Sequence, residues 1–112
     1  MYLGLDVSQN TLDCCLNKDG FFYACKISNN EKGFQKLRAW LDGHGCDETL
    51  HCCCEAAGNY YEAAAEYLAA HYKMSVENPR KIKAYAVSEL KRSKNDKQDA
   101  KTIAEFCEEK SR

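Results

Sequence analysis

Hydrophobic and polar residues alternate along the first part of the chain, which is the pattern of half-buried β-strands. In the stretch YLGLDV, Leu3, Leu5 and Val7 fall on one side of an extended chain and Asp6 falls on the other. Two similar stretches follow, each after a short run of turn-forming Ser, Asn, Asp or Gly residues. We therefore predict an antiparallel meander of three strands, over residues 2–7, 11–16 and 21–27.

The remainder of the chain alternates between helical and extended patterns. Phe34, Leu37 and Leu41 recur at the spacing of one helical face, after Asn29 or Asn30 as a candidate N-cap. The expected elements are a helix over residues 30–42, a strand over 49–54, a helix over 59–72, a strand over 74–77 and a helical segment over 80–110 with a break near 93–95.

This order of elements predicts an α/β fold with a mixed sheet, in which a three-strand antiparallel meander is followed by alternating helices and strands. Parallel strands need crossover connections, and helices of the expected length can serve as such connections. The order matches that of the ribonuclease H-like, or RuvC-like, fold.

The size and composition fit one soluble globular domain. The chain has 112 residues, of which 45% are hydrophobic and 29% are charged, and a domain of this size buries roughly two-thirds of the surface of its unfolded chain. No apolar run approaches the ~18 residues that a membrane span requires. The first residues, MYLGLDVSQN, also lack the basic start and apolar core of a signal peptide. We therefore expect a cytoplasmic protein with no membrane partner.

Charge is distributed unevenly, although the formal net charge is only -1. Residues 80–101 hold eight of the sixteen Lys and Arg residues against three acidic residues, so this segment carries +5 and the remainder carries -6. Such a basic segment can hold a polyanion such as a nucleic acid, although it is more often a solvated helix face. The charge alone leaves both interpretations open.

Four acidic residues occupy positions that point to a shared site. Asp6 lies inside the first predicted strand, where a charge is costly unless it is paired or bound to a cation. Glu55 ends the fourth predicted strand, which is the neighbour of the first in a ribonuclease H-like sheet. Asp96 and Asp99 are three residues apart, which puts both on one face of a helix. The four side chains could meet near the carboxyl edge of the sheet, where α/β proteins tend to bind ligands.

Carboxylates that meet in one pocket repel each other, and divalent cations relieve this repulsion. A ligand set of oxygens alone suits Mg²⁺ or Mn²⁺, and two such ions roughly 4 Å apart can promote cleavage of a phosphodiester. The expected metal ligands and catalytic residues are Asp6, Glu55, Asp96 and Asp99. Simpler interpretations stay open, with Asp96 as a helix N-cap, Asp99 as a first-turn acid and Glu55 as a surface acid.

The eight cysteines include two runs, Cys14–Cys15 and Cys52–Cys54. Neighbouring side chains of a strand point to opposite faces, so neither run can form a CxxC-type chelate. Nothing indicates secretion, so we expect reduced thiols that are buried as small hydrophobic residues. The alternative is a zinc site that combines His51 with some of the cysteines. Otherwise His44, His51 and His71 are expected to lie at the surface or in the packed core.

Four motifs occur together in the order and at the approximate spacing of one protein family. They are GLDVS at residues 4–8, CEAAGNY at 54–60, ENPRKIKAYA at 77–86 and KNDKQDA at 94–100. Each motif is weak alone, but four in register are a specific signal. On these motifs the chain, from about Leu3 to Phe106, resembles the N-terminal RuvC-like domain of the DEDD transposases of insertion sequence family 110, a group that includes the pilin-gene invertases.

The resemblance implies a chemistry and partners. The four metal-binding acids of the family correspond to Asp6, Glu55, Asp96 and Asp99, and these acids bind magnesium and assist DNA strand cleavage and exchange. Family members are directed by a structured noncoding RNA, so DNA and a guide RNA are the implied partners. The full-length protein is expected to be a homo-oligomer. The candidates for phosphate contacts are Arg80, Lys81, Lys83, Lys91, Arg92, Lys94 and Lys97.

The chain departs from the family pattern in a few places. Asn95 stands where Ser or Thr is usual and Ala57 stands where Thr is common, but neither is a metal ligand. Full family members continue into a C-terminal domain with a nucleophilic serine, and nothing here matches it. We therefore expect residues 1–112 to be a single nuclease domain, as a fragment or an isolated domain. Two alternatives stay open, an RNA- and DNA-binding module that is inactive without the missing domain, and a nuclease that resembles Holliday junction resolvases.

Overall fold

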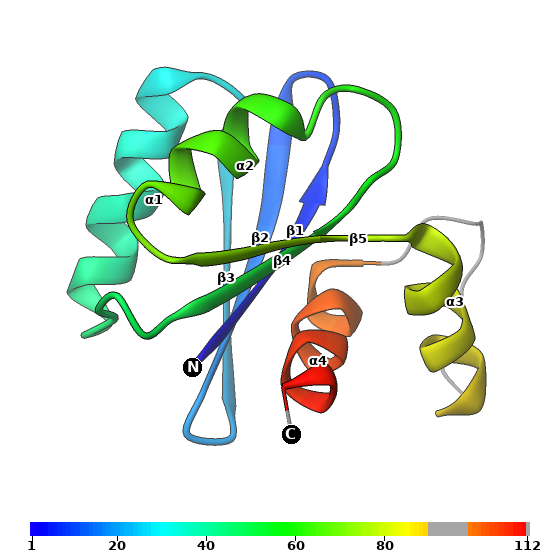
Figure 1. Cartoon of the computed structure of the whole chain (residues 1–112). Coiled ribbons are helices and arrows are strands. Elements are labelled where there is room, and N and C mark those ends of the chain that lie inside the picture. The colour runs from blue at the N-terminus through cyan, green and yellow to red at the C-terminus, as the bar shows by residue number, and fades with distance from the viewer. Residues whose placement is uncertain (90–98, 112) are drawn as a thin grey trace.

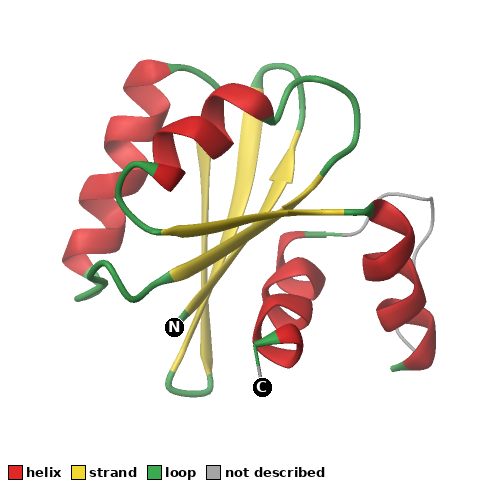
Figure 2. Ribbon diagram, in the orientation of Figure 1, coloured by secondary structure: helices red, strands yellow, loops and turns green. Residues whose placement is uncertain are grey.

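The computed structural model describes residues 1–89 and 99–111 and contains a mixed sheet covered by helices on both faces (Figures 1 and 2). The strands are β1 (Tyr2–Val7), β2 (Thr11–Lys18), β3 (Phe21–Ser28), β4 (His51–Glu55) and β5 (Lys73–Glu77). The helices are α1 (Glu31–Gly43), α2 (Glu62–Ala69), α3 (Pro79–Ser88) and α4 (Ala100–Lys110). Helices α1 and α2 lie on one side of the sheet, and α4, with α3 beside it, lies on the other (Figure 1).

The sheet confirms the fold class that the sequence predicts. Its strand order is β3-β2-β1-β4-β5. The first three strands pair antiparallel as a meander, whereas β4 pairs parallel with β1, and β5 pairs parallel with β4. This arrangement is compatible with the ribonuclease H-like fold, and it makes β1 the central strand.

Two predicted boundaries are wrong in ways that matter for the site. The helix expected from residue 59 begins at Glu62, because Gly58 has a φ of 66° and the chain turns before the helix starts. The strand expected from residue 49 begins only at His51, and it ends at Glu55 as expected. Glu55 is therefore held within the sheet.

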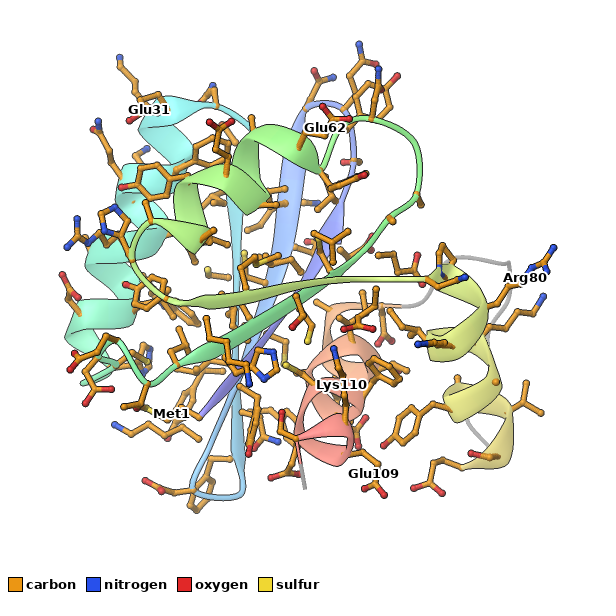
Figure 3. The ribbon with its side chains drawn as sticks, viewed as in Figure 1. Met1, Glu31, Glu62, Arg80, Glu109 and Lys110 are labelled. Atoms are coloured by element: carbon orange, nitrogen blue, oxygen red, sulfur yellow. The ribbon has the colours of Figure 1, made fainter. Side chains whose placement is uncertain are left out.

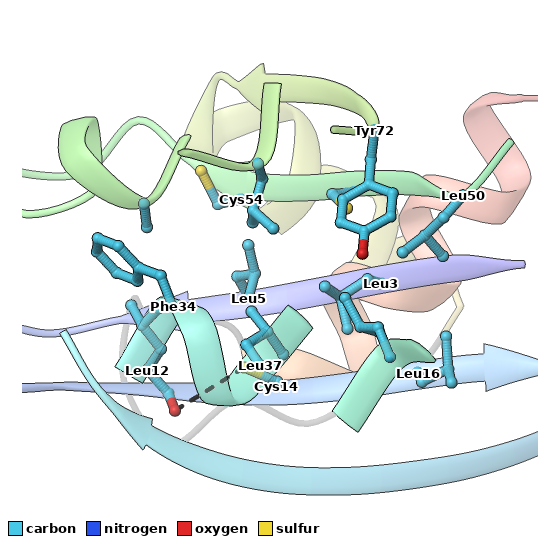
Figure 4. Packing of buried hydrophobic residues seen from close by; sticks show 14 of the residues in the cluster. Leu3, Leu5, Leu12, Cys14, Leu16, Phe34, Leu37, Leu50, Cys54 and Tyr72 are labelled. Atoms are coloured by element: carbon cyan, nitrogen blue, oxygen red, sulfur yellow. Dashed lines mark hydrogen bonds between the residues drawn. The ribbon is translucent and has the colours of Figure 1, made fainter. Parts of the chain in front are cut away.

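The face of the sheet under α1 and α2 forms a leucine-rich core (Figure 4). Leu3 and Leu5 of β1 pack there with Phe34 and Leu37 of α1, and fully burying a leucine contributes about 1.5–3 kcal/mol. Of the two candidate caps, Asn29 and Asn30, it is Asn30 that caps α1, and its side chain accepts a hydrogen bond from the backbone N–H of Gly33 at 2.9 Å. This face of the sheet is filled by apolar side chains, so the candidate functional residues lie on the opposite face.

The opposite face of β1 carries α4 at very short range. A Cβ atom added at Gly4 would lie 2.1 Å from the carbonyl oxygen of Ala100 and 2.4 Å from the backbone nitrogen of Ala104. Cys15 of β2 is buried with the same two alanines. Small side chains thus let the helix backbone rest almost directly on the strand.

None of the described helices combines the length and the hydropathy that a membrane-spanning helix requires.

Replacing Gly4 with alanine should lower the free energy of unfolding by about 3 kcal/mol, because the backbone atoms of α4 cannot move aside as a flexible side chain can. Urea denaturation monitored by circular dichroism measures the change. Gly43→Ala is the matched control, because a Cβ there meets no atom within 4 Å. A Gly4→Ala variant as stable as the parent chain would contradict this docking of α4.

Candidate functional site

Asp6 and Glu55 lie next to each other on neighbouring parallel strands. Leu5 of β1 is paired with Cys54 of β4, so the residues that follow them, Asp6 and Glu55, are adjacent across the sheet. Both side chains line a small cavity of about 10 Å³ together with Ile103 of α4. Glu55 is only 7% exposed, and a buried carboxylate needs compensating interactions. The structure thus brings these two predicted residues together.

Asp99 approaches the same end of the sheet from α4. Its side chain accepts a hydrogen bond from the backbone N–H of Thr102 at 2.8 Å, which makes it the N-cap of the helix. The prediction that Asp99 lies on a helical face is therefore wrong, because α4 begins only at Ala100. Asp6 and Asp99 both line a groove of about 510 Å³. Asp96, the other member of the predicted pair, lies outside the described residues.

Asp6 links the three described acids, since it shares the small cavity with Glu55 and the groove with Asp99. Within residues 1–89 and 99–111, however, the oxygens of these three carboxylates are not close enough together to form a compact set of metal ligands. The acids are gathered at one end of the sheet, but their oxygens do not converge on one point.

The groove contains charged residues that the sequence pattern did not single out. Asp13 is paired with Asp6 across β1 and β2, and its carboxylate lies 3.8 Å from the ammonium group of Lys26 on β3. Lys101 Nζ lies 4.8 Å from the ring centroid of Phe22, and both residues also line the groove. Asp13 lies between two buried residues of β2. A charged residue inside an apolar strand is the same pattern that made Asp6 a candidate, so the sequence could have indicated Asp13 as well.

Glu77 extends the row of acids to the edge strand but is already neutralised. It is paired with Glu55 across β4 and β5 and is 6% exposed. The ammonium group of Lys110 donates a hydrogen bond to its carboxylate, and this bond raises the pKa of Lys110. Glu77 therefore fixes the end of α4 to β5 and is a poor candidate for a metal ligand.

The described part of the predicted nucleic-acid surface lies on α3. Asn78 caps this helix by accepting a hydrogen bond from the backbone N–H of Arg80 at 2.8 Å. Arg80, Lys81 and Lys83 are exposed, and Arg80 projects away from the sheet in Figure 3. The other candidates, Lys91, Arg92, Lys94 and Lys97, lie outside the described residues.

The eight cysteines are all described, and all are free thiols, seven of them buried and Cys25 half-buried. This agrees with the expected role as small buried residues. Cys53 and Cys107 nevertheless face His51, and the candidate ligand atoms of the three residues all lie within 4.8 Å of one another. Burial lowers the pKa of the His51 imidazole. The pKa of the Cys107 thiol is raised, mainly by a hydrogen bond with Cys53 and secondly by burial. This cluster is on the same face of the sheet as α4.

The other two histidines take part in packing. The rings of His44 and Trp40 have centroids 4.6 Å apart, and those of His71 and Tyr67 are 5.2 Å apart. Arg38 lies 3.3 Å from the Nε2 atom of His71. These contacts agree with the packing role expected for both histidines.

Comparison with known proteins agrees with the sequence motifs. The sequence model of the DEDD transposases of insertion sequence family 110, described as a transposase, matches residues 3–112. The pilin gene-inverting proteins of Moraxella bovis and Moraxella lacunata are each 39% identical to the chain over 107 residues. These alignments cover 94% of this chain and 33% of each relative, so the chain spans about one third of their length.

Replacing Asp99 with alanine should lower the free energy of unfolding by about 1 kcal/mol, because the N–H of Thr102 loses its acceptor. Asp99→Asn should cost only a few tenths of a kcal/mol, because the asparagine oxygen can also cap the helix. Thermal or urea unfolding of both variants measures the difference. Equal losses for the two variants would show that the charge of Asp99, rather than the cap, supports the fold.

Proposed function

Because the chain belongs to the DEDD transposase family of insertion sequence family 110, we propose that it is the metal-dependent catalytic domain of a transposase or site-specific recombinase. In this role it helps to cleave and exchange DNA strands. The observation that carries the proposal is the position of Asp6, which lines a cavity with Glu55 and a groove with Asp99. The relatives are named for inverting a pilin gene, which supports DNA as the substrate.

The donor set fits the proposed ion. Asp6, Glu55 and Asp99 offer only carboxylate oxygens, which Mg²⁺ and Mn²⁺ prefer over nitrogen or sulfur ligands. The hydrogen bond to Thr102 uses one oxygen of Asp99, and a carboxylate has a second oxygen for a metal. Asp96 would complete the four acids of the family. A small movement of side chains would still be needed for the oxygens to converge.

Residues of this chain would hold both the ion and the DNA. When bound, divalent ions can activate the attacking nucleophile and stabilise the leaving oxygen at a phosphodiester. The carboxylates of Asp6, Glu55 and Asp99 would hold the ions at the end of β1, β4 and α4. Lys26 and Lys101 line the groove beside Asp6 and Asp99, where their charge would attract the phosphates of DNA. The N-terminus of α4 adds a partial positive charge at the same place.

A second candidate function is nucleic-acid binding without complete chemistry in this domain. It is favoured by the exposed basic residues of α3, Arg80, Lys81 and Lys83, which would bind a structured guide RNA or DNA through phosphate contacts. Salt-dependent RNA binding that survives replacement of all four acids would favour this function. Guidance by a structured noncoding RNA and a homo-oligomeric full-length protein are part of the first proposal, the recombinase domain.

Millimolar Mg²⁺ or Mn²⁺ should raise the melting temperature of the chain, by roughly 5–10 °C at about ten times the dissociation constant. Asp6→Asn should abolish this shift, because Asp6 lies in both the cavity and the groove. Differential scanning fluorimetry with and without EDTA provides the measurement.

Asp42→Asn is the control for loss of a negative charge, because Asp42 is exposed on α1. The readout is the metal-induced shift of each variant, since removing a repelled carboxylate can itself raise the melting temperature. A parent chain with no shift, or an Asp6→Asn variant with the full shift, would exclude this metal site.

A further inference from the structure

A cluster of three buried side chains lies between β4 and α4, away from the carboxylates discussed above. His51 and Cys53 are two residues apart on β4 and so point to the same face, and Cys107 of α4 faces them. Their exposed fractions are 5%, 0% and 0%. We propose that His51, Cys53 and Cys107 bind a zinc ion that joins α4 to the sheet. This proposal does not depend on the transposase function.

The distances within the cluster are close to those of a zinc site. The Sγ atom of Cys53 lies 3.9 Å from Nε2 of His51, and all three ligand atoms are within 4.8 Å of one another. Tetrahedral zinc, with Zn–S near 2.3 Å and Zn–N near 2.0 Å, separates such atoms by roughly 3.5–3.8 Å. Closing the site therefore requires side-chain shifts of about 1 Å, which rotation of the cysteines can supply.

A hydrogen-bond chain orients the imidazole for this role. Ser111 Oγ donates a hydrogen bond to the carbonyl oxygen of Cys107 at 2.8 Å. The same Oγ lies 2.8 Å from Nδ1 of His51, and since its proton is already used, it must accept one from Nδ1. Nε2 then carries the lone pair of the ring, which accepts a hydrogen bond from Ser75 Oγ at 2.7 Å, and Cys53 Sγ lies 3.9 Å from the same nitrogen. A histidine that ligates a metal is commonly held in this way by a hydrogen bond from its other nitrogen.

A fourth position lies beside β5. Ser75 Oγ is 2.7 Å from Nε2 of His51 and donates to it, so a zinc ion that takes this lone pair would displace the hydroxyl by a short distance. Zinc with three protein ligands takes a water or another oxygen as the fourth ligand, and Ser75 can supply or position that oxygen. Two sulfur ligands and one nitrogen ligand favour zinc over magnesium, which distinguishes this cluster from the carboxylate groove.

The position of the ion indicates a structural role. Cys107 lies eight residues after the Asp99 cap, about two turns along α4. Zinc bound there would fix the helix to β4 at a second point besides Gly4. The proposed role is therefore structural, and it would hold Asp99 in its place over the sheet.

Zinc content tests the proposal directly. After purification under reducing conditions and dialysis against metal-free buffer, the parent chain should retain about one zinc per chain, measured by inductively coupled plasma mass spectrometry. Cys53→Ala and Cys107→Ala should each reduce the retained zinc at least fivefold. Cys54→Ala is the matched control, because Cys54 is the next residue on β4 and is equally buried, but it packs in the leucine-rich core on the other face. It should retain the zinc of the parent chain.

Cobalt substitution of the parent chain tests the site even if the variants fail to fold. Co²⁺ in the proposed site should give the d–d bands of tetrahedral coordination together with a thiolate-to-metal charge-transfer band, and excess Mg²⁺ should not remove them. The proposal is overturned if these bands are absent, if the parent chain holds only background zinc, or if Cys107→Ala retains as much zinc as the parent. A disulfide between Cys53 and Cys107 in the purified, zinc-free chain would likewise overturn it.

Discussion

The contact between α4 and Gly4 is the constraint on which the rest of this face depends. The carbonyl of Ala100 and the backbone nitrogen of Ala104 occupy the space where any other side chain at position 4 would begin. The helix can therefore lie on the central strand only because that residue has no Cβ. Further along, Cys107 donates a hydrogen bond through its thiol to the carbonyl oxygen of His51 at 3.5 Å, and Lys110 holds Glu77. Together these contacts fix where α4 begins, and hence where Asp99 lies.

Successive residues of each strand point to opposite faces of the sheet, so the two faces differ in composition and in role. Leu3 and Leu5 build the core under α1 and α2, and the residues between and after them, Gly4 and Asp6, face α4. A carboxylate on a central strand is costly in a small core. Here it lies at the edge of that core, near the N-terminus of a helix, whose partial positive charge stabilises anions. Strand β1 therefore contributes both to the core that stabilises the domain and, through Asp6, to the proposed metal site.

Sequence reasoning succeeded where local pattern determines structure and failed where distant contacts do. The meander follows from alternation along the chain. The adjacency of Asp6 and Glu55 is expected from the ribonuclease H-like arrangement, in which the first and fourth strands are neighbours. Whether Asp99 lies on a helix face or caps the helix depends on where α4 begins, which the periodicity leaves open by a few residues. The approach of Cys107 to Cys53 depends on packing between segments 54 residues apart, and no pattern along the chain encodes that distance.

The proposed metal site requires that α4 bring Asp99 to the end of β1 where Asp6 and Glu55 lie. A crystal structure of the chain grown with Mn²⁺, with anomalous diffraction measured to locate the ion, tests this most directly. We expect manganese in the groove, coordinated by carboxylate oxygens of Asp6 and Asp99, with Glu55 as a further ligand. Manganese bound only at other places, or an α4 displaced from Gly4 with Asp99 far from Asp6, would contradict it.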